Sequence, residues 1–171
     1  MQIVIGEWRI RSYERSDVDA LARHANNRNI SIHLRDRFPY PYTRRDARDS
    51  IDRARVLDPE THFAIATATE LIGGIGFQPQ EDVYRRSAEI GYWIAEPFWG
   101  RGIATRAVRA ISAYAFARFD LVRLFACVFG GNSASERVLE KAGYQCEGNL
   151  RRCVFKENRL LDQKIYALLR D

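Results

Sequence analysis

Two glycines, Gly100 and Gly102, lie one residue apart in the stretch FWGRGIAT (98–105), directly before a helix-forming sequence. Glycine costs roughly 1 kcal/mol relative to alanine inside a helix, so a pair at a helix entry indicates that backbone groups are needed there. The first N–H groups of a helix lack helical acceptors, and the helix dipole adds positive potential. Because glycines also remove Cβ atoms that would keep a ligand away, the stretch predicts an anion site best suited to phosphate.

Two common phosphate-binding motifs are absent from this stretch. The pattern G-x-G-x-x-G fails because position 105 is Thr105, and there is no G-x-x-x-x-G-K-[ST]. What remains is a short turn of a size that suits a pyrophosphate. Close packing of the helix against a strand explains the glycines equally well and stays open as the alternative.

Cysteine usage and charge exclude other classes of site. Cys127, Cys146 and Cys153 have no C-x-x-C spacing, and the three histidines have no metal-like spacing, so we expect a cytoplasmic protein with no metal site. Cys127 has apolar neighbours and is expected in the core rather than as a nucleophile. The formal net charge is +5, but acids interrupt the arginines, as in 44–55. That mixture is typical of a solvated helix face, so we expect no specific nucleic-acid partner, and no apolar run predicts a membrane partner.

The elements that position the turn follow from the spacing of apolar residues. Alternation predicts strands, and apolar residues three or four apart predict helices. The predicted strands are 7–13, 62–67, 70–77, 87–94, 121–129, a strand near 144–150, 153–156 and 160–169. Helices are predicted after Ser16, within 26–42, after Thr43, over 102–118 and from Ser133. This order predicts a mixed α/β fold in a single domain, 1–171, with helices on a largely antiparallel sheet.

Local signals mark the helix ends. Ser16 and Thr43 are predicted as helix caps, and Ser133 and Glu136 have the spacing of a capping box. Gly143 lies where a helix end requires a left-handed φ.

One helix and two strands form a predicted βαβ unit. The strand 87–94, the helix 102–118 and the strand 121–129 follow one another, which implies a parallel strand pair. The continuous apolar run LVRLFACVF (121–129) predicts a strand that is buried on both faces.

The sequence W-G-R-G-I-A-T (99–105) resembles the acyl-CoA pyrophosphate loop of the GNAT N-acetyltransferase superfamily, whose pattern is Q/R-x-x-G-x-G/A. Gly102 and Ala104 match the last two positions, whereas Trp99 replaces Gln or Arg, which is similar to the RimJ/RimL branch of ribosomal-protein N-terminal acetyltransferases and relatives. The likeness extends along nearly the whole chain through RIRSYERSDVDAL, PYPYT, AEIGYWI and NSASERVLEKAGY. It implies the GNAT fold, in which helices flank a mostly antiparallel, splayed sheet.

The resemblance also implies acetyl-CoA as cosubstrate. In the family, the strand before the loop splays from its neighbour at a bulge, and its backbone binds the pantetheine arm, which here implies Tyr92, Trp93 and Ile94. The pyrophosphate is then held by the backbone amides of Arg101, Gly102, Ile103, Ala104 and Thr105. Asn132 resembles a CoA-contacting Asn of the family, although Asn is equally favoured as a helix N-cap and one residue can do both.

Two residues are candidates for proton transfer. Glu89, within A-E-I, matches the base glutamate of the histone acetyltransferase branch and could accept a proton through water; the alternative is an ion pair across the sheet. The common Tyr acid of relatives is Leu139 here, so the ribosomal-protein pattern N-x-x-S implies Ser135 as the proton donor to the leaving thiolate. A first-turn serine that bonds to backbone is the alternative.

The acceptor is left open at this level. A primary amine is expected, either a protein N-terminus or a small molecule such as an amino acid, an antibiotic or a polyamine. Aromatic residues in the loop around 35–42 are candidates to flank it, and the hairpin 151–162 is expected to face them; surface packing explains these aromatics equally well. A non-catalytic acyl-CoA-binding regulatory module is the alternative of another class, and a homodimer is compatible with the sequence.

Overall fold

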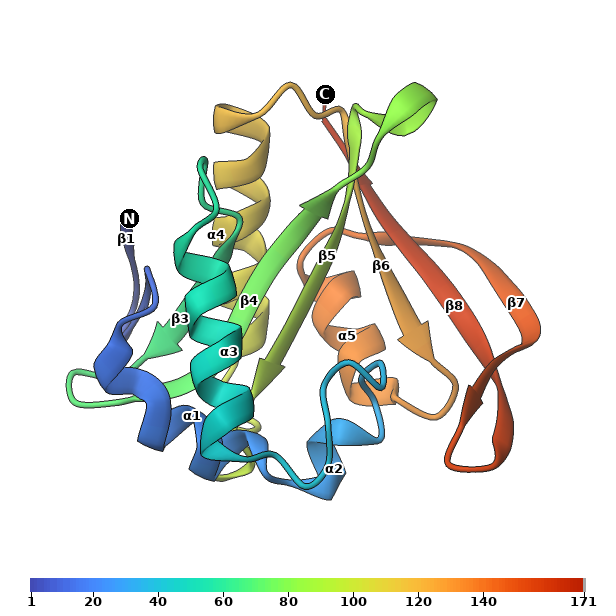
Figure 1. Ribbon diagram of the computed structural model, residues 1–171. Coiled ribbons are helices and arrows are strands. Elements are labelled where there is room, and N and C mark those ends of the chain that lie inside the picture. The colour runs from blue at the N-terminus through green and yellow to red at the C-terminus, as the bar shows by residue number, and fades with distance from the viewer. Residues whose placement is uncertain (171) are drawn as a thin grey trace. The chain divides into compact units, whose positions relative to one another are not determined.

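The computed structural model describes residues 1–170, which form a mixed α/β fold. Eight strands lie in one sheet in the order β1-β2-β3-β4-β5-β6-β8-β7, and helices flank it (Figure 1). The strands are β1 Gln2–Ile5, β2 Trp8–Arg11, β3 His62–Ala66, β4 Leu71–Pro79, β5 Ser87–Ile94, β6 Arg123–Phe129, β7 Gln145–Lys156 and β8 Arg159–Leu169. The helices are α1 Val18–Ala25, α2 Arg28–Ser31, α3 Arg44–Arg55, α4 Ile103–Arg118 and α5 Ser133–Lys141, with 3₁₀ turns at Arg15–Asp17, Asp82–Tyr84 and Glu96–Phe98.

Strand pairing confirms the predicted sheet. The β5–β6 pair is parallel, as the predicted βαβ unit requires. The pairs β1–β2, β2–β3, β3–β4, β6–β8 and β7–β8 are antiparallel. The strand β1 was not predicted; it has four residues, and its register with β2 runs from Gln2 opposite Arg11 to Ile5 opposite Trp8.

The chain folds as two compact units that share β4, β5 and α4. The first unit comprises Met1–Gly76 and Tyr92–Ala107, and the second comprises 77–91 and 108–170. In the first unit, α1 and α3 pack together over β3 and the start of β4. Their shared core consists of Leu21, Ala25, Tyr42, Ala47, Ile51, Ala64 and Leu71. Each large apolar side chain buried in this way contributes about 1.5–3 kcal/mol.

The prediction for the start of α3 is confirmed. The Thr43 hydroxyl accepts a hydrogen bond from the Asp46 amide at 3.2 Å, and the Asp46 carboxylate accepts one from the Thr43 amide at 2.8 Å. This reciprocal pair is a capping box.

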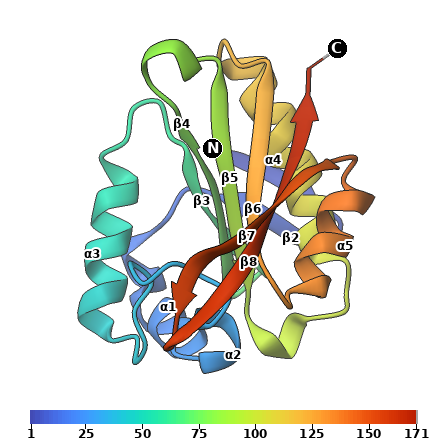
Figure 2. The same cartoon turned by 90° about the vertical axis from the view of Figure 1, so that its right-hand side faces the viewer.

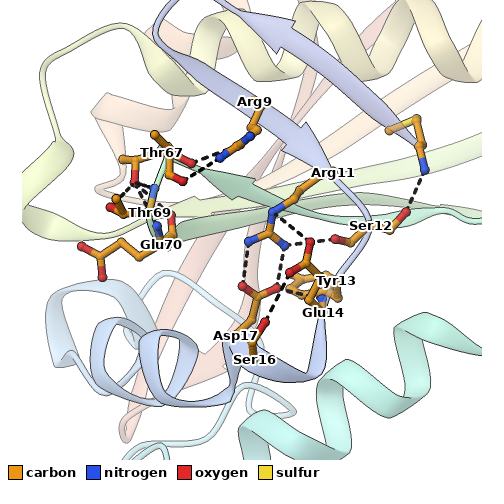
Figure 3. A network of polar contacts seen from close by, with 12 residues as sticks. Arg9, Arg11, Ser12, Tyr13, Glu14, Ser16, Asp17, Thr67, Thr69 and Glu70 are labelled. Atoms are coloured by element: carbon orange, nitrogen blue, oxygen red, sulfur yellow. Dashed lines mark hydrogen bonds and ion pairs between the residues drawn. The ribbon is translucent and has the colours of Figure 1, made fainter.

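The prediction that Ser16 caps the first helix is wrong. Asp17 holds the N-cap position of α1, but its side chain makes no cap bond to that helix. Its carboxylate instead accepts the Glu14 amide at 2.9 Å, which closes the preceding 3₁₀ turn, and both Arg11 Nη atoms at 2.7 Å (Figure 3). Ser16 instead donates to the Glu14 carboxylate. Asp17 is 4% exposed, and removing one member of a buried ion pair costs about 3–5 kcal/mol. The pair therefore fastens β2 to the start of α1, and the ion pair with Arg11 of β2, which the helix pattern does not include, orients Asp17 there.

In the second unit, β6 is buried on one face, so the prediction of burial on both faces is wrong. Leu124, Ala126 and Val128 are buried, whereas the alternating Arg123, Phe125 and Cys127 are half-buried. The buried face lies against α5, because Tyr166, opposite Ala126 in the register, reaches the Glu136 and Glu140 carboxylates of α5. Cys127 is consequently less buried than the core position expected for it.

The two strands predicted at 144–150 and 153–156 are one long strand, β7, paired with β8 (Figure 2). Its register shifts between Leu150 and Val154, where Arg152 has φ +54° and its amide donates to Asp162 Oδ1 at 2.9 Å. The hairpin turns at Glu157 and Asn158, both with positive φ, as a two-residue turn demands. Gly143 has φ +97° at the end of α5, as predicted.

Candidate functional site

In the turn before α4, residues 100–105 (the glycine turn), no neighbouring side chain of residues 1–170 covers the backbone at the two glycines. Gly100 and Gly102 have φ of +76° and +74°, and a Cβ built at either position would have no atom within 4 Å. The first hydrogen bond of the helix runs from the Arg106 amide to the Gly102 carbonyl at 3.2 Å. The amides of residues 102–105 therefore precede the helical ladder and are donors available to an anion. The open space around both glycines favours the ligand-binding interpretation over close packing of the helix against a strand.

The end of β5 leads into this turn through a fixed corner. The Ala95 amide donates to the Ile72 carbonyl of β4 at 2.8 Å, and Pro97 lies in the 3₁₀ turn Glu96–Phe98. The Trp99 indole Nε1 donates to the Ile94 carbonyl at 2.6 Å, which closes the corner.

A second set of contacts fastens the same corner to the segment between α1 and α2. The Glu96 carboxylate accepts the side-chain amide of Asn27 at 2.5 Å and that of Asn29 at 3.2 Å. The Asn27 bond, followed by the Asn29 bond, lowers the pKa of Glu96 below its ordinary value. Phe98 packs edge-on against His24, with ring centroids 6.1 Å apart. These residues were not predicted as part of the site, because a glutamate beside a proline matches no known motif.

Two glycines of β4 let the strand carrying Trp93 approach closely. A Cβ at Gly73 would collide with the Trp93 carbonyl oxygen, and one at Gly74 would lie 2.7 Å from Trp93 Nε1 and 2.6 Å from the Tyr13 hydroxyl. Phe38, from the aromatic loop before α3, lies 5.7 Å from Trp93 between ring centroids and 4.8 Å from Tyr42. Part of the predicted aromatic cluster is thus packing for the Trp93 strand, while Tyr40 is exposed.

In the second unit, Asn132 is the N-cap of α5. Its Oδ1 accepts the Ser135 amide at 3.2 Å, so the capping role is real, and the side-chain NH₂ still provides two donors. The predicted capping box of Ser133 and Glu136 is wrong, because Glu136 instead accepts Lys164 Nζ at 2.7 Å. Ser135 is the third residue of α5 and is half-buried.

Glu89 lies at the end of the parallel pairing in the second unit. The β5–β6 register covers Ser87 to Glu89 opposite Arg123 to Phe125. Glu89 is half-buried and shares its face with Phe125, on the side of β6 away from α5. On the same face, the Arg123 guanidinium lies 5.8 Å from the Phe125 ring centroid and donates to Glu147 Oε1 at 2.7 Å.

The structure thus distributes the predicted residues over both units. Tyr92, Trp93 and Ile94 and the turn 101–105 belong to the first unit. Glu89, Asn132 and Ser135 belong to the second. Among residues 1–170, no three His, Cys, Asp or Glu side chains are grouped to hold a metal ion, and no helix is both long and apolar enough to cross a membrane.

A comparison with known families decides the assignment. The sequence profile of the Acetyltransferase (GNAT) domain matches residues 8–145. The chain belongs to the GNAT acetyltransferase family. Within this family, the GNAT domain described here is 39% identical to YoaA of Bacillus subtilis, an uncharacterized N-acetyltransferase, over 101 residues, which are 59% of this chain and 56% of YoaA. It is 32% identical to the ribosomal-protein-serine acetyltransferase of Escherichia coli over 109 residues, which are 64% of this chain and 60% of that protein. The chain spans less than two thirds of the length of both relatives.

Solved structures share the fold of this GNAT domain. RimL, a ribosomal L7/L12 α-N-protein acetyltransferase solved in complex with coenzyme A, aligns with a TM-score of 0.87 at 23% identity, over 99% of this chain and 98% of that one. The fold predicted from the sequence is therefore confirmed.

Proposed function

We propose that this GNAT domain is an acetyl-CoA-dependent N-acetyltransferase that acts on a primary amine by direct attack in a ternary complex. The observation that carries the proposal is the turn 100–105. Its two left-handed glycines face open space, and the amides that follow them have no helical acceptor. Such a turn is suited to the diphosphate of CoA.

The cofactor would be held by backbone groups of the first unit. The amides of Arg101, Gly102, Ile103, Ala104 and Thr105 would bind the diphosphate, and the strand residues Tyr92 to Ile94 would bind the pantetheine arm. The Ile94 carbonyl already accepts Trp99 Nε1, so the carbonyls of Tyr92 and Trp93 are the better candidates to accept hydrogen bonds from the N–H groups of the pantetheine arm. Asn132 would contribute its side-chain NH₂ to CoA while its Oδ1 caps α5.

The chemistry requires a neutral amine and a protonated leaving group. An α-amino group with a pKa of ~8 is roughly one-tenth neutral at pH 7. Its nitrogen attacks the thioester carbonyl, a C–N bond forms, and the C–S bond breaks. We assign to Glu89 the proton that the nitrogen loses as the intermediate collapses, through water, and to Ser135 the proton that the departing thiolate gains. Ser135 is then reprotonated by way of Glu89 or solvent.

A protein N-terminal α-amine is our preferred acceptor. RimL and the Escherichia coli relative are named for ribosomal proteins. A ribosomal-protein acceptor would place the reaction in the cytoplasm. An N-terminus also demands less of the base than a lysine side chain, whose pKa is near ~10.4. Small-molecule amines are the second class, and a non-catalytic acyl-CoA-binding module is the alternative function.

The test is the release of CoA thiol from acetyl-CoA in the presence of amines and of short peptides with free N-termini. We expect release with the wild type, and a loss of roughly 10²-fold in kcat for Glu89→Gln and for Ser135→Ala. Calorimetry with CoA should give unchanged affinity in both variants. CoA binding without acetylation of any amine would favour the regulatory module.

A further inference from the structure

His62 lies on the same face of the first unit as Trp93. In the β3–β4 register His62 is opposite Gly76, and Ala64 is opposite Gly74. A Cβ at Gly76 would lie 2.8 Å from His62 Cδ2, just as a Cβ at Gly74 would lie 2.7 Å from Trp93 Nε1. Alternate residues of a strand share a face, about 7 Å apart, so two glycines of β4 accommodate an imidazole and an indole next to one another.

The order of these residues along β4 shows where His62 lies relative to the glycine turn. Ile72 bonds to Ala95, the residue from which the chain enters the glycine turn. Two residues further along β4, Gly74 lies beside Trp93, and two residues after that, Gly76 lies beside His62. The strand therefore leads from the turn, past the residues proposed to bind the pantetheine arm, to His62. This inference rests on the proposed function, since it takes the arm to follow β5.

The imidazole is held in place and is unprotonated near neutral pH, so a ring nitrogen has a lone pair for a proton. His62 Nδ1 lies 3.0 Å from the hydroxyl of Thr61, which is 7% exposed. In the tautomer that the proposal requires, Nδ1–H donates to this hydroxyl and Nε2 carries the lone pair. Burial, and then the positive charge of Arg37 from the segment after α2, lower the pKa of His62 from its ordinary value. The ring is therefore neutral near pH 7.

We propose that His62 Nε2 removes the first proton from the ammonium form of the acceptor. The step converts R–NH₃⁺ and neutral imidazole into R–NH₂ and imidazolium. The amine then attacks the thioester as described above, and the imidazolium returns its proton to solvent. His62 thus determines how basic an amine the enzyme can use, because an amine that is already neutral has no need of this step.

The test is His62→Gln, assayed by CoA thiol release with three amines of increasing basicity: trifluoroethylamine, glycinamide and ethylamine. We expect kcat/KM to fall by roughly 10²-fold with ethylamine and to stay unchanged with trifluoroethylamine, with glycinamide between them. The matched control is His24→Gln, which removes an imidazole bound to the Glu70 carboxylate in the same unit. It should affect the three amines equally.

A second variant tests the proposal without removing the imidazole, in case His62→Gln does not fold. Thr61→Val keeps the imidazole and removes its hydrogen-bond partner, and it should give a smaller loss with the same order among amines. Equal losses across the three amines in both His62→Gln and Thr61→Val would overturn the inference and leave the proposed function intact. Absence of thiol release by the wild type with every amine and peptide would remove the proposed function, and this inference with it.

Discussion

The indole Nε1 of Trp99 donates a hydrogen bond of 2.6 Å to the carbonyl oxygen of Ile94. The bond spans the five residues between the end of β5 and the glycine turn, so it sets the angle at which the chain enters the turn. This accounts for a tryptophan where the pyrophosphate-loop pattern has Gln or Arg: the side chain is exposed, and its indole N–H closes the corner.

Trp99→Phe should weaken CoA binding because it removes this bond and keeps an aromatic ring. A hydrogen bond of this kind is worth about 0.5–1.5 kcal/mol, which corresponds to a two- to tenfold higher Kd for CoA. Calorimetry of CoA binding measures the effect. Trp8→Phe, a substitution of the same type on β2, keeps an aromatic ring under the Arg106 guanidinium and should leave the Kd unchanged. An unaltered Kd in Trp99→Phe would show that the corner does not set the turn.

Gly102→Ala should raise the Kd for CoA, whereas its loss of stability should be no larger than that of a control variant. A left-handed φ costs alanine about 1–2 kcal/mol, and the new Cβ would occupy the open space at the turn where the diphosphate is proposed to bind. Gly143→Ala is the matched control, because Gly143 also has a positive φ and its Cβ would meet just one atom, Leu168 Cδ1, at 3.7 Å. Thermal unfolding should shift similarly in the two variants. Equal CoA affinities in both variants would contradict the role of the turn.

Substitutions of Asn132 can separate its two roles. Asn132→Asp keeps an equally good N-cap for α5 but replaces the NH₂ group with a negative charge, so stability should hold while CoA affinity falls. Asn132→Ala removes the cap as well and should cost about 1 kcal/mol of unfolding free energy. Urea denaturation and CoA titration of each variant give both readouts. If Asn132→Asp binds CoA with the affinity of the wild type, Asn132 acts as a helix cap and does not contact CoA.

The lowered pKa of Glu96 should make the free energy of unfolding depend on pH. Its folded-state pKa lies below the ordinary value of 4.5, so its contribution is present above 4.5 and is lost as the pH falls through the lowered pKa. The wild type should therefore exceed Glu96→Gln in unfolding free energy at neutral pH, and the gap should close in acid. Urea denaturation across this range measures it. In an Asn29→Ala background, the difference in unfolding free energy between the protein with Glu96 and its Glu96→Gln variant should be smaller at neutral pH. A difference that does not change with pH would show that the Glu96 carboxylate is not its source.

The parts of the fold that depend on local sequence were predictable. The Thr43 cap and the left-handed Gly143 are formed by residues within a few positions of each other, and both are confirmed. The errors arise where a partner outside the helix decides. Asp17 rather than Ser16 organises the start of α1, because its ion-pair partner Arg11 lies on β2, six residues earlier in the chain. Glu136 does not form a capping box, because Lys164 and Tyr166 of β8 compete for its carboxylate.

The same distinction holds for the candidate site. Gly102 and its neighbours were found because a glycine turn before a helix is a local signal. Glu96 and His62 were not singled out as functional residues, because their interest comes from contacts with Asn27 and Asn29 in one case and from the register of Gly76 in the other. Neither relationship is visible until the strands and loops are placed.

The central claim is that the amides at the start of α4 bind the diphosphate of CoA. Backbone amide NMR during a titration with CoA tests it directly. We predict the largest shift changes at residues 101–105, and none there with pantetheine, which lacks the diphosphate. CoA binding that leaves these amides unshifted, or the absence of any binding, would contradict the account.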